Sequence, residues 1–118
     1  MKDLSYFSKI YLAVQPVDFR KQMRGLSDLV GVRFQKNIFE ERTLFVFRNK
    51  RRDSIRLLYW DSSGFAMWSK LLEKEKFKWI KSKEESQKLS SKELKWLLQG
   101  VDIAKLKFHE KLEFKGTY

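Results

Sequence analysis

The densest group of side chains that could do chemistry is a run of five cations within nine residues. Its members are Arg48, Lys50, Arg51, Arg52 and Arg56. Guanidinium and ammonium groups on a rigid turn can bind phosphate oxygens, and log affinity for a duplex then falls with log salt by about 0.9 per neutralised phosphate. A basic loop that only maintains solubility has a similar composition, because turns of mixed Asn, Lys and Asp are common.

A second basic segment, residues 70–83, mixes lysines with aromatic side chains. Together, such residues can hold a nucleic-acid backbone and stack on exposed bases. The alternative that we favour places the aromatic residues in the core and the lysines on a solvated face. The residues concerned are Lys70, Lys74, Lys76, Lys78, Lys81 and Lys83, with Phe77 and Trp79 between them.

Catalytic chemistry finds little support in the sequence. Cysteine is absent and His109 is the one histidine, which argues against thiolate zinc sites and Ser-His-Asp triads. The five glycines are scattered, so no phosphate-binding loop is formed. A two-metal nuclease needs carboxylates that converge from separate strands. The candidates show no such pattern, so we expect no catalytic centre, cofactor or metal: Asp18, Glu40, Glu41, Asp53, Asp61 and Asp102.

Length and charge point to one domain with a polyanionic partner. The 118 residues fit a single domain, and a hydrophobic content of 42% can supply its core. The formal net charge of +11 favours nucleic acid over a membrane surface. No run approaches the roughly 20 apolar residues of a membrane span, and the first eight residues lack the apolar stretch of a signal peptide. We therefore expect a cytoplasmic protein.

The elements that would position the cations begin with a short apolar strand at residues 10–14, which Pro16 ends. A helix is expected next, with Asp18 as its N-cap and Gly31 near its end. Apolar residues recur at helical spacing from Phe19 to Val30, and Arg20, Lys21 and Arg24 then lie on the other face.

Two β-branched and aromatic runs, residues 43–48 and 54–60, predict a hairpin whose polar loop carries the cation run. In the second run Ile55, Leu57 and Tyr59 share one face, while Arg56, Leu58 and Trp60 share the other. Because neither face is plainly polar, we expect this strand to be central.

Residues 61–64 are expected to form a turn, and the spacing of Phe65, Trp68, Leu71 and Leu72 then predicts a second helix. A short strand at 77–80 and a polar loop at 82–88 should follow. A capping box of Ser90 and Glu93 starts a third helix.

In this third helix, Leu89 and Leu94 occupy hydrophobic-staple positions and Gly100 is the predicted stop. The fold class is thus α+β: a compact domain, residues 1–103, with a central antiparallel hairpin or sheet packed by about three helices. Residues 104–118 form a C-terminal extension of the same domain, read as an edge strand or a loose tail.

At this point about residues 10–103 resemble one family, the accessory proteins encoded by the second open reading frame of insertion sequence 66 transposons, often called TnpB. They share only that name with the RNA-guided nucleases. The chain departs from the family at Glu75, where a glycine is common, and beyond Asp102. The matching residues are Val17-Asp18-Phe19-Arg20-Lys21, Gly25-Leu26, the stretch from Leu44 to Asp53, Leu57-Leu58-Tyr59-Trp60-Asp61, Gly64-Phe65, Lys70, Leu72-Glu73-Lys74, Phe77, Leu89-Ser90, Leu94, Leu97-Leu98, Gly100 and Asp102.

The resemblance implies a protein needed for efficient transposition, encoded beside a larger transposase that carries the catalytic acids. We therefore expect a non-catalytic accessory protein that binds element DNA through a basic face, with the transposon ends as a candidate target, or that assists the transposase. The alternatives are a module that docks the transposase without DNA, an RNA-binding domain, and a small metal-dependent nuclease. The predicted nucleic-acid-binding residues are Arg20, Lys21, Arg24, Arg48, Lys50, Arg51, Arg52 and Arg56.

Overall fold

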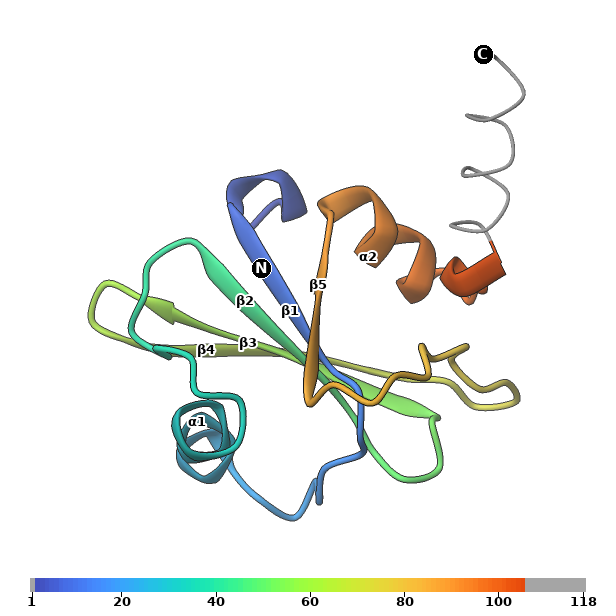
Figure 1. The fold of residues 1–118 in the computed structure, drawn as a ribbon, viewed down its shortest axis with the longest axis horizontal. Coiled ribbons are helices and arrows are strands. Elements are labelled where there is room, and N and C mark those ends of the chain that lie inside the picture. Colours follow the sequence, from blue (N-terminus) through green and yellow to red (C-terminus); the bar gives the residue numbers. More distant parts are fainter. Residues whose placement is uncertain (1, 106–118) are drawn as a thin grey trace.

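A five-stranded sheet forms the centre of the chain in a computed structural model that describes residues 2–105 (Figure 1). The strand order is β4-β3-β2-β1-β5, in which β1 and β2 are parallel and the other neighbours are antiparallel. This arrangement confirms the α+β class. The strands are β1 (Lys9–Ala13), β2 (Thr43–Arg48), β3 (Ser54–Asp61), β4 (Gly64–Leu71) and β5 (Ser86–Leu89).

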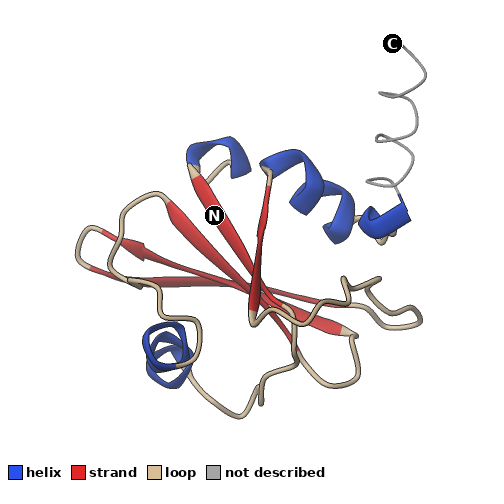
Figure 2. Ribbon diagram, viewed as in Figure 1, coloured by secondary structure: helices blue, strands red, loops and turns tan. Residues whose placement is uncertain are grey.

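Helical elements lie on both sides of the sheet (Figure 2). On one side α1 (Met23–Val32) buries Leu26 and Val30 against strand residues such as Phe47. On the other side lie the 3-10 turn η1 (Leu4–Tyr6) and α2 (Ser91–Leu98), where Leu94 and Leu97 are fully buried. Because both faces are covered, the central strands are apolar on both sides.

The predicted hairpin is confirmed. β2 and β3 pair antiparallel from Leu44–Tyr59 to Arg48–Ile55, which leaves residues 49–53 as the connecting loop. The expectation of a central β3 is also confirmed, because β3 pairs with β2 on one edge and with β4 on the other. Its two faces contribute to different cores, with Leu57 in one and Leu58 in the other. β3 thereby fixes the loop rigidly to the body of the protein.

The prediction of a helix after the turn at residues 61–64 is wrong, because the chain there forms strand β4. Asp61 pairs with Gly64, so Ser62 and Ser63 form a two-residue hairpin loop, and Ser62 takes the positive φ of 51° that such loops require. Phe65 and Met67 then pack on one face of the sheet. Ala66 and Trp68 pack on the other face, and this two-sided burial gave the misleading helical spacing.

The first helix begins four residues later than predicted, at Met23. Its N-cap is Gln22, which makes no side-chain cap bond, and Asp18 instead accepts the backbone N–H of Arg20 in a local turn. Gly31 lies inside the helix, and the C-cap is Arg33. Arg20 and Lys21 consequently lie in the segment that leads into α1, and only Arg24 is helical.

The segment between β4 and α2 also differs from the prediction. Residues 77–80 form no strand, although Phe77, Trp79 and Ile80 are buried as core residues. The predicted loop at residues 82–88 extends too far, because β5 begins at Ser86 and pairs with β1. The short β5 was missed because Ser86–Leu89 is mostly polar, as an edge strand can be.

The third predicted helix is confirmed as α2. Glu93 N–H donates to the Ser90 hydroxyl at 3.0 Å, and Ser90 N–H donates to the Glu93 carboxylate at 2.9 Å, which completes the capping box. Gly100 follows the C-cap Gln99 with a φ of 85°, as a glycine stop requires. Most of the tail predicted at 104–118 lies outside the described residues.

Within residues 2–105, no helix is long and apolar enough to cross a membrane.

Candidate nucleic-acid interface

The loop between β2 and β3, which we call the tip (residues 49–53), is organised by Asn49. Its side-chain amide donates to the Asp53 carboxylate at 2.6 Å, and its amide oxygen accepts the N–H of Ser54 at 3.1 Å. The Arg52 N–H closes the turn onto the Asn49 carbonyl at 3.2 Å, with a positive φ of 61° at Arg52. These bonds use the polar groups of Asn49 and Asp53 internally and leave Lys50, Arg51 and Arg52 exposed.

The lysine-rich segment after β4 is fastened to this tip by two backbone hydrogen bonds. Leu72 N–H donates to the Asp53 carbonyl, and Phe77 N–H donates to the Arg52 carbonyl, both at 2.7 Å. The segment thus lies beside the tip although it follows about 20 residues later in the sequence. Between them is an open hollow of about 520 Å³, lined by Arg52, Lys74, Glu75, Lys76, Phe77, Lys78 and Gly100.

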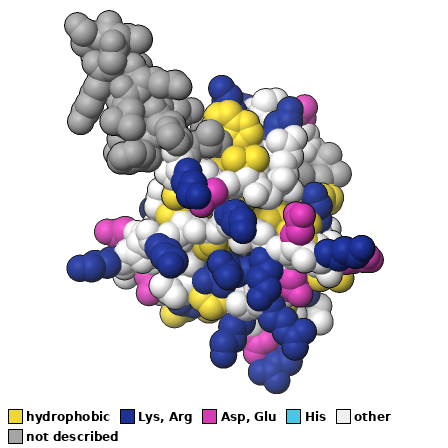
Figure 3. All heavy atoms as spheres, turned by 90° about the vertical axis from the view of Figure 1, so that its right-hand side faces the viewer, with side chains coloured by type: hydrophobic (Ala, Val, Ile, Leu, Met, Phe, Trp, Pro, Cys, Tyr) yellow, Lys and Arg dark blue, Asp and Glu magenta, His cyan; other side chains and the backbone are white. Residues whose placement is uncertain are grey.

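Two segments therefore build one surface, which we call the basic face and define as Lys50, Arg51, Arg52, Lys74, Lys76 and Lys78. All six side chains are exposed, and none takes part in a salt bridge within residues 2–105. Figure 3 looks at this side of the molecule and shows Lys and Arg side chains gathered over its centre and lower part, with a few Asp and Glu among them. Such a surface attracts a polyanion.

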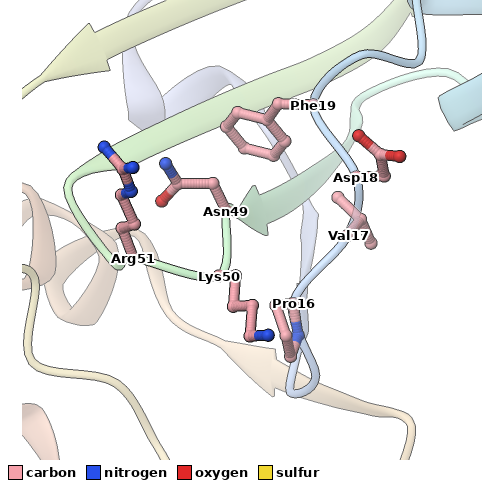
Figure 4. A pocket seen from close by; sticks show the side chains of 7 residues that line it. All are labelled: Pro16, Val17, Asp18, Phe19, Asn49, Lys50 and Arg51. Atoms are coloured by element: carbon pink, nitrogen blue, oxygen red, sulfur yellow. The ribbon is translucent and has the colours of Figure 1, made fainter.

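On its other flank the tip borders an open cleft of about 420 Å³ (Figure 4). The Val17 N–H donates to the Arg48 carbonyl at 3.0 Å and so holds the residues after β1 against the hairpin. The lining is mainly apolar on the β1 side and polar or cationic on the tip side. It consists of Pro16, Val17, Asp18, Phe19, Asn49, Lys50 and Arg51.

Arg56 joins the hairpin to the segment before α1. Its guanidinium carbon lies 4.3 Å from the centre of the Phe19 ring, and its Nη1 donates to the Lys21 carbonyl at 3.0 Å. A guanidinium stacked on an aromatic ring is held in place while its remaining N–H groups stay free to donate. The structure thereby brings Arg56 and Lys21 together near the cleft.

Arg20 is the one predicted residue of the eight that is neutralised by a salt bridge within the described residues. Its Nη2 lies 2.7 Å from Oδ2 of Asp18, and its Nε donates to the same carboxylate at 3.0 Å. These side-chain hydrogen bonds, followed by the backbone bond from Arg20, lower the pKa of Asp18 to about 2. The pair therefore stays ionised at neutral pH, and it reduces the attraction of Arg20 for an anion.

Arg48 points inward, unlike its neighbours in the tip. Its guanidinium lies 5.8 Å from the Trp79 ring, and its Nε is buried without a hydrogen-bond partner in the described structure. Burial, and secondarily the charge of Arg52, lowers the pKa of Arg48. Trp79 is itself only 9% exposed and donates its indole N–H to the Ala13 carbonyl. The favoured interpretation of Phe77 and Trp79 as core residues is confirmed.

The eight predicted residues thus divide by position. Lys50, Arg51 and Arg52 share the tip, with Arg48 beneath it, and Arg56 lies near Lys21. Arg24 is exposed on α1, where its carbonyl accepts the Ser27 hydroxyl. The prediction omitted Lys74, Lys76 and Lys78 from the site, although their density was visible in the sequence. The missing information was the pair of long-range backbone bonds that places them beside Arg52.

The acidic residues are dispersed. Asp18, Glu40 and Asp61 pair with Arg20, Lys9 and Lys2 respectively. Within residues 2–105 no three His, Cys, Asp or Glu side chains come close enough together to hold a metal ion.

Comparison with known proteins identifies a family and a curated relative. The family model described as "IS66 Orf2 like protein" matches residues 8–108. An uncharacterized protein of Sinorhizobium fredii (strain NBRC 101917 / NGR234), y4jC, is 39% identical over 99 residues, which cover 84% of this chain and 84% of the relative. No solved structure gives a significant match.

Proposed function

This chain belongs to the family of IS66 Orf2-like proteins, and from that premise we propose that it binds the DNA of its transposable element through the basic face. Membership implies an accessory role in transposition of an insertion sequence. Our proposal makes that role non-catalytic and cytoplasmic, and it assigns the chemistry of strand transfer to the separate transposase.

The observation that carries the proposal is the convergence of two basic segments. The bonds from Leu72 to Asp53 and from Phe77 to Arg52 place six exposed cations on one side of a rigid hairpin. Phosphate contacts from such cations provide affinity and register, whereas base-edge contacts would have to provide sequence preference. Arg56, Lys21 and Arg24 extend the proposed contact surface toward α1.

The test is a comparison of two triple variants with the same change in charge. In one, Lys50, Arg51 and Arg52 of the tip are replaced by Ala. In the matched control, Lys88, Lys92 and Lys95 of β5 and α2 are replaced by Ala; these residues are also exposed but lie away from the tip. Binding to duplex DNA with the element's terminal repeats, and to scrambled DNA, is measured by fluorescence anisotropy at several salt concentrations.

We expect the tip variant to lose affinity and its log-log salt slope to become shallower by about 0.9 for each lost phosphate contact. The control should lose much less. Equal losses in both variants would show that only net charge matters, and absence of binding to either DNA would refute the proposal. A preference for terminal-repeat over scrambled DNA would add recognition of the element's ends.

An aromatic cluster at the opposite end of β3 supports a second candidate function, docking of the transposase. Phe39 is 57% exposed, and its ring centre lies 5.1 Å from Trp60 and 5.8 Å from Phe65. Exposed aromatic groups are typical of protein interfaces. Co-purification of the element's transposase in the absence of DNA, with loss of this association in a Phe39→Ala variant, would favour this function.

A further inference from the structure

The cleft beside the tip combines features that a DNA duplex would not use. Pro16, Val17 and Phe19 provide apolar surface, while Lys50 and Arg51 place cations on the opposite wall (Figure 4). A volume of about 420 Å³ lies in the range of pockets that hold small organic molecules. The cleft is therefore large enough for a nucleobase, and its cations are continuous with the basic face.

Phe19 is the central residue of this cleft. It lies outside any helix or strand, is half-buried, and is held by the Arg56 guanidinium at 4.3 Å. The part of the ring that lines the cleft offers an aromatic surface for stacking. In an intact duplex both faces of each base are already stacked, whereas an unpaired base can stack on a protein side chain.

We propose that this cleft takes one unpaired base of a DNA strand, with Phe19 as the stacking surface and Lys50 and Arg51 on the adjoining phosphates. This inference rests on the proposed DNA-binding function and narrows its substrate to DNA with single-stranded, gapped or frayed segments. The apolar lining would contact the unpaired base, and the cationic wall would contact the phosphates of the strand.

The charge density of DNA makes the proposal testable. Duplex DNA has the higher phosphate density, so a purely electrostatic face prefers a duplex to a single strand. A protein that stacks an unpaired base shows the opposite preference, because each base stacked on an aromatic ring strengthens binding about fivefold or more. The order of affinities therefore separates the two modes.

The experiment uses the full chain and four fluorescein-labelled substrates of about 20 nucleotides, longer than the usual site of a single-strand-binding domain. These are a single strand, the blunt duplex, the same duplex with a short central gap, and an RNA strand of the same sequence. A 2-aminopurine placed in the gap reports stacking directly. We expect the gapped and single-stranded DNA to bind about fivefold or more tightly than the blunt duplex, with quenching of the 2-aminopurine.

Phe19→Leu keeps an apolar side chain but removes the aromatic ring, and it should abolish the preference and the quenching. Phe19→Trp should retain both. Tyr11→Leu is the matched control, since Tyr11 is also a half-buried aromatic residue with a cation, Lys36, over its ring, but it lines neither the cleft nor the basic face. This variant should bind the four substrates as the unmodified protein does. Far-UV circular dichroism confirms that each variant is folded.

The outcomes distinguish failure of the base-binding cleft from failure of the proposed DNA-binding function. Tighter binding to the blunt duplex, or an unchanged preference in Phe19→Leu, overturns the base-binding cleft and leaves duplex binding standing. Tighter binding of the RNA strand than of any DNA overturns the assignment to DNA. Failure of all four substrates to bind overturns both proposals.

Discussion

Asp18 and Arg20 form a local ion pair whose geometry limits what Arg20 can contribute to binding. The carboxylate accepts both the backbone N–H and the guanidinium of Arg20, and the pKa of Asp18 falls from 3.8 to about 2. A lowered carboxyl pKa means that the pair is fully present above pH 3.8 and is lost as the pH falls through about 2. Across the neutral range Arg20 therefore remains paired.

The pKa of Asp18 gives the first prediction at this scale. A carboxyl-detected NMR titration should place the Asp18 midpoint near 2, and Arg20→Ala should move it up toward 3.8, because the side-chain donor is the largest cause of the shift. A midpoint that does not move in Arg20→Ala would contradict the observed pairing.

A second residue-scale prediction concerns DNA. Asp18→Asn releases the Arg20 guanidinium, so we expect tighter DNA binding and a salt slope steeper by about 0.9 if Arg20 reaches a phosphate. Asp28→Asn on α1 is the control, because it makes the same charge change at another exposed position. Equal changes in DNA affinity and salt slope in the two variants would show that Arg20 does not contact the DNA.

Two glycines in different backbone conformations, Gly100 after α2 and Gly31 within α1, allow a paired stability test. Gly100 has a φ of 85°, which an L-amino acid adopts only with strain, whereas Gly31 lies within α1 and an added Cβ there meets no atom within 4 Å. We expect Gly100→Ala to lower the free energy of unfolding by about 1 kcal/mol. Gly31→Ala should raise it by up to about 1 kcal/mol.

Urea denaturation, followed by circular dichroism, measures both changes. Because the two substitutions add the same methyl group, opposite signs can arise only from backbone conformation and helix propensity. Destabilisation by both to the same extent would mean that Gly31 is constrained in a way that the structure does not show.

At the level of elements, the sequence predicted what local patterns determine. The β2–β3 hairpin and the Ser90–Glu93 capping box depend on neighbouring residues, and both are present. β4 was misread as a helix, because Phe65, Trp68 and Leu71 fit a helical spacing when both faces of a strand are apolar. The approach of Phe77 to Arg52 is a long-range contact, and no local pattern encodes it.

The candidate site was predictable to the same extent. The cations of the tip were identified from their density alone, and their exposure matches a hairpin loop. Two aspects escaped prediction: the inward orientation of Arg48 over Trp79, and the cleft that Phe19 lines. Both depend on where separate elements meet. The predicted helix from Asp18 would have placed Phe19 in the core.

For the whole molecule, the surplus of 26 Lys and Arg over 15 Asp and Glu creates self-repulsion in the folded state. We expect the Tm to rise by a few degrees when NaCl is raised from about 20 to about 300 mM, because salt screens this repulsion. Differential scanning fluorimetry at constant pH provides the measurement.

The tip variant with Lys50, Arg51 and Arg52 replaced by Ala should gain less stability from salt, since part of the repulsion is already removed. DNA affinity should change in the opposite direction to Tm over the same salt series. A Tm that falls with added salt would indicate that attractive ion pairs outweigh repulsion in this chain.

The bracing of the tip from both flanks has a thermodynamic consequence for recognition. Val17 holds the tip through Arg48, and Phe77 holds it through Arg52, so the loop is already ordered in the free protein. A basic arm that folds only on contact loses conformational entropy at that moment, and part of its interaction energy offsets the loss. In this protein the tip loses that conformational entropy when the chain folds, before any DNA binds. Association through this loop should therefore resemble the docking of a rigid surface, with little change in backbone order between the free and bound states.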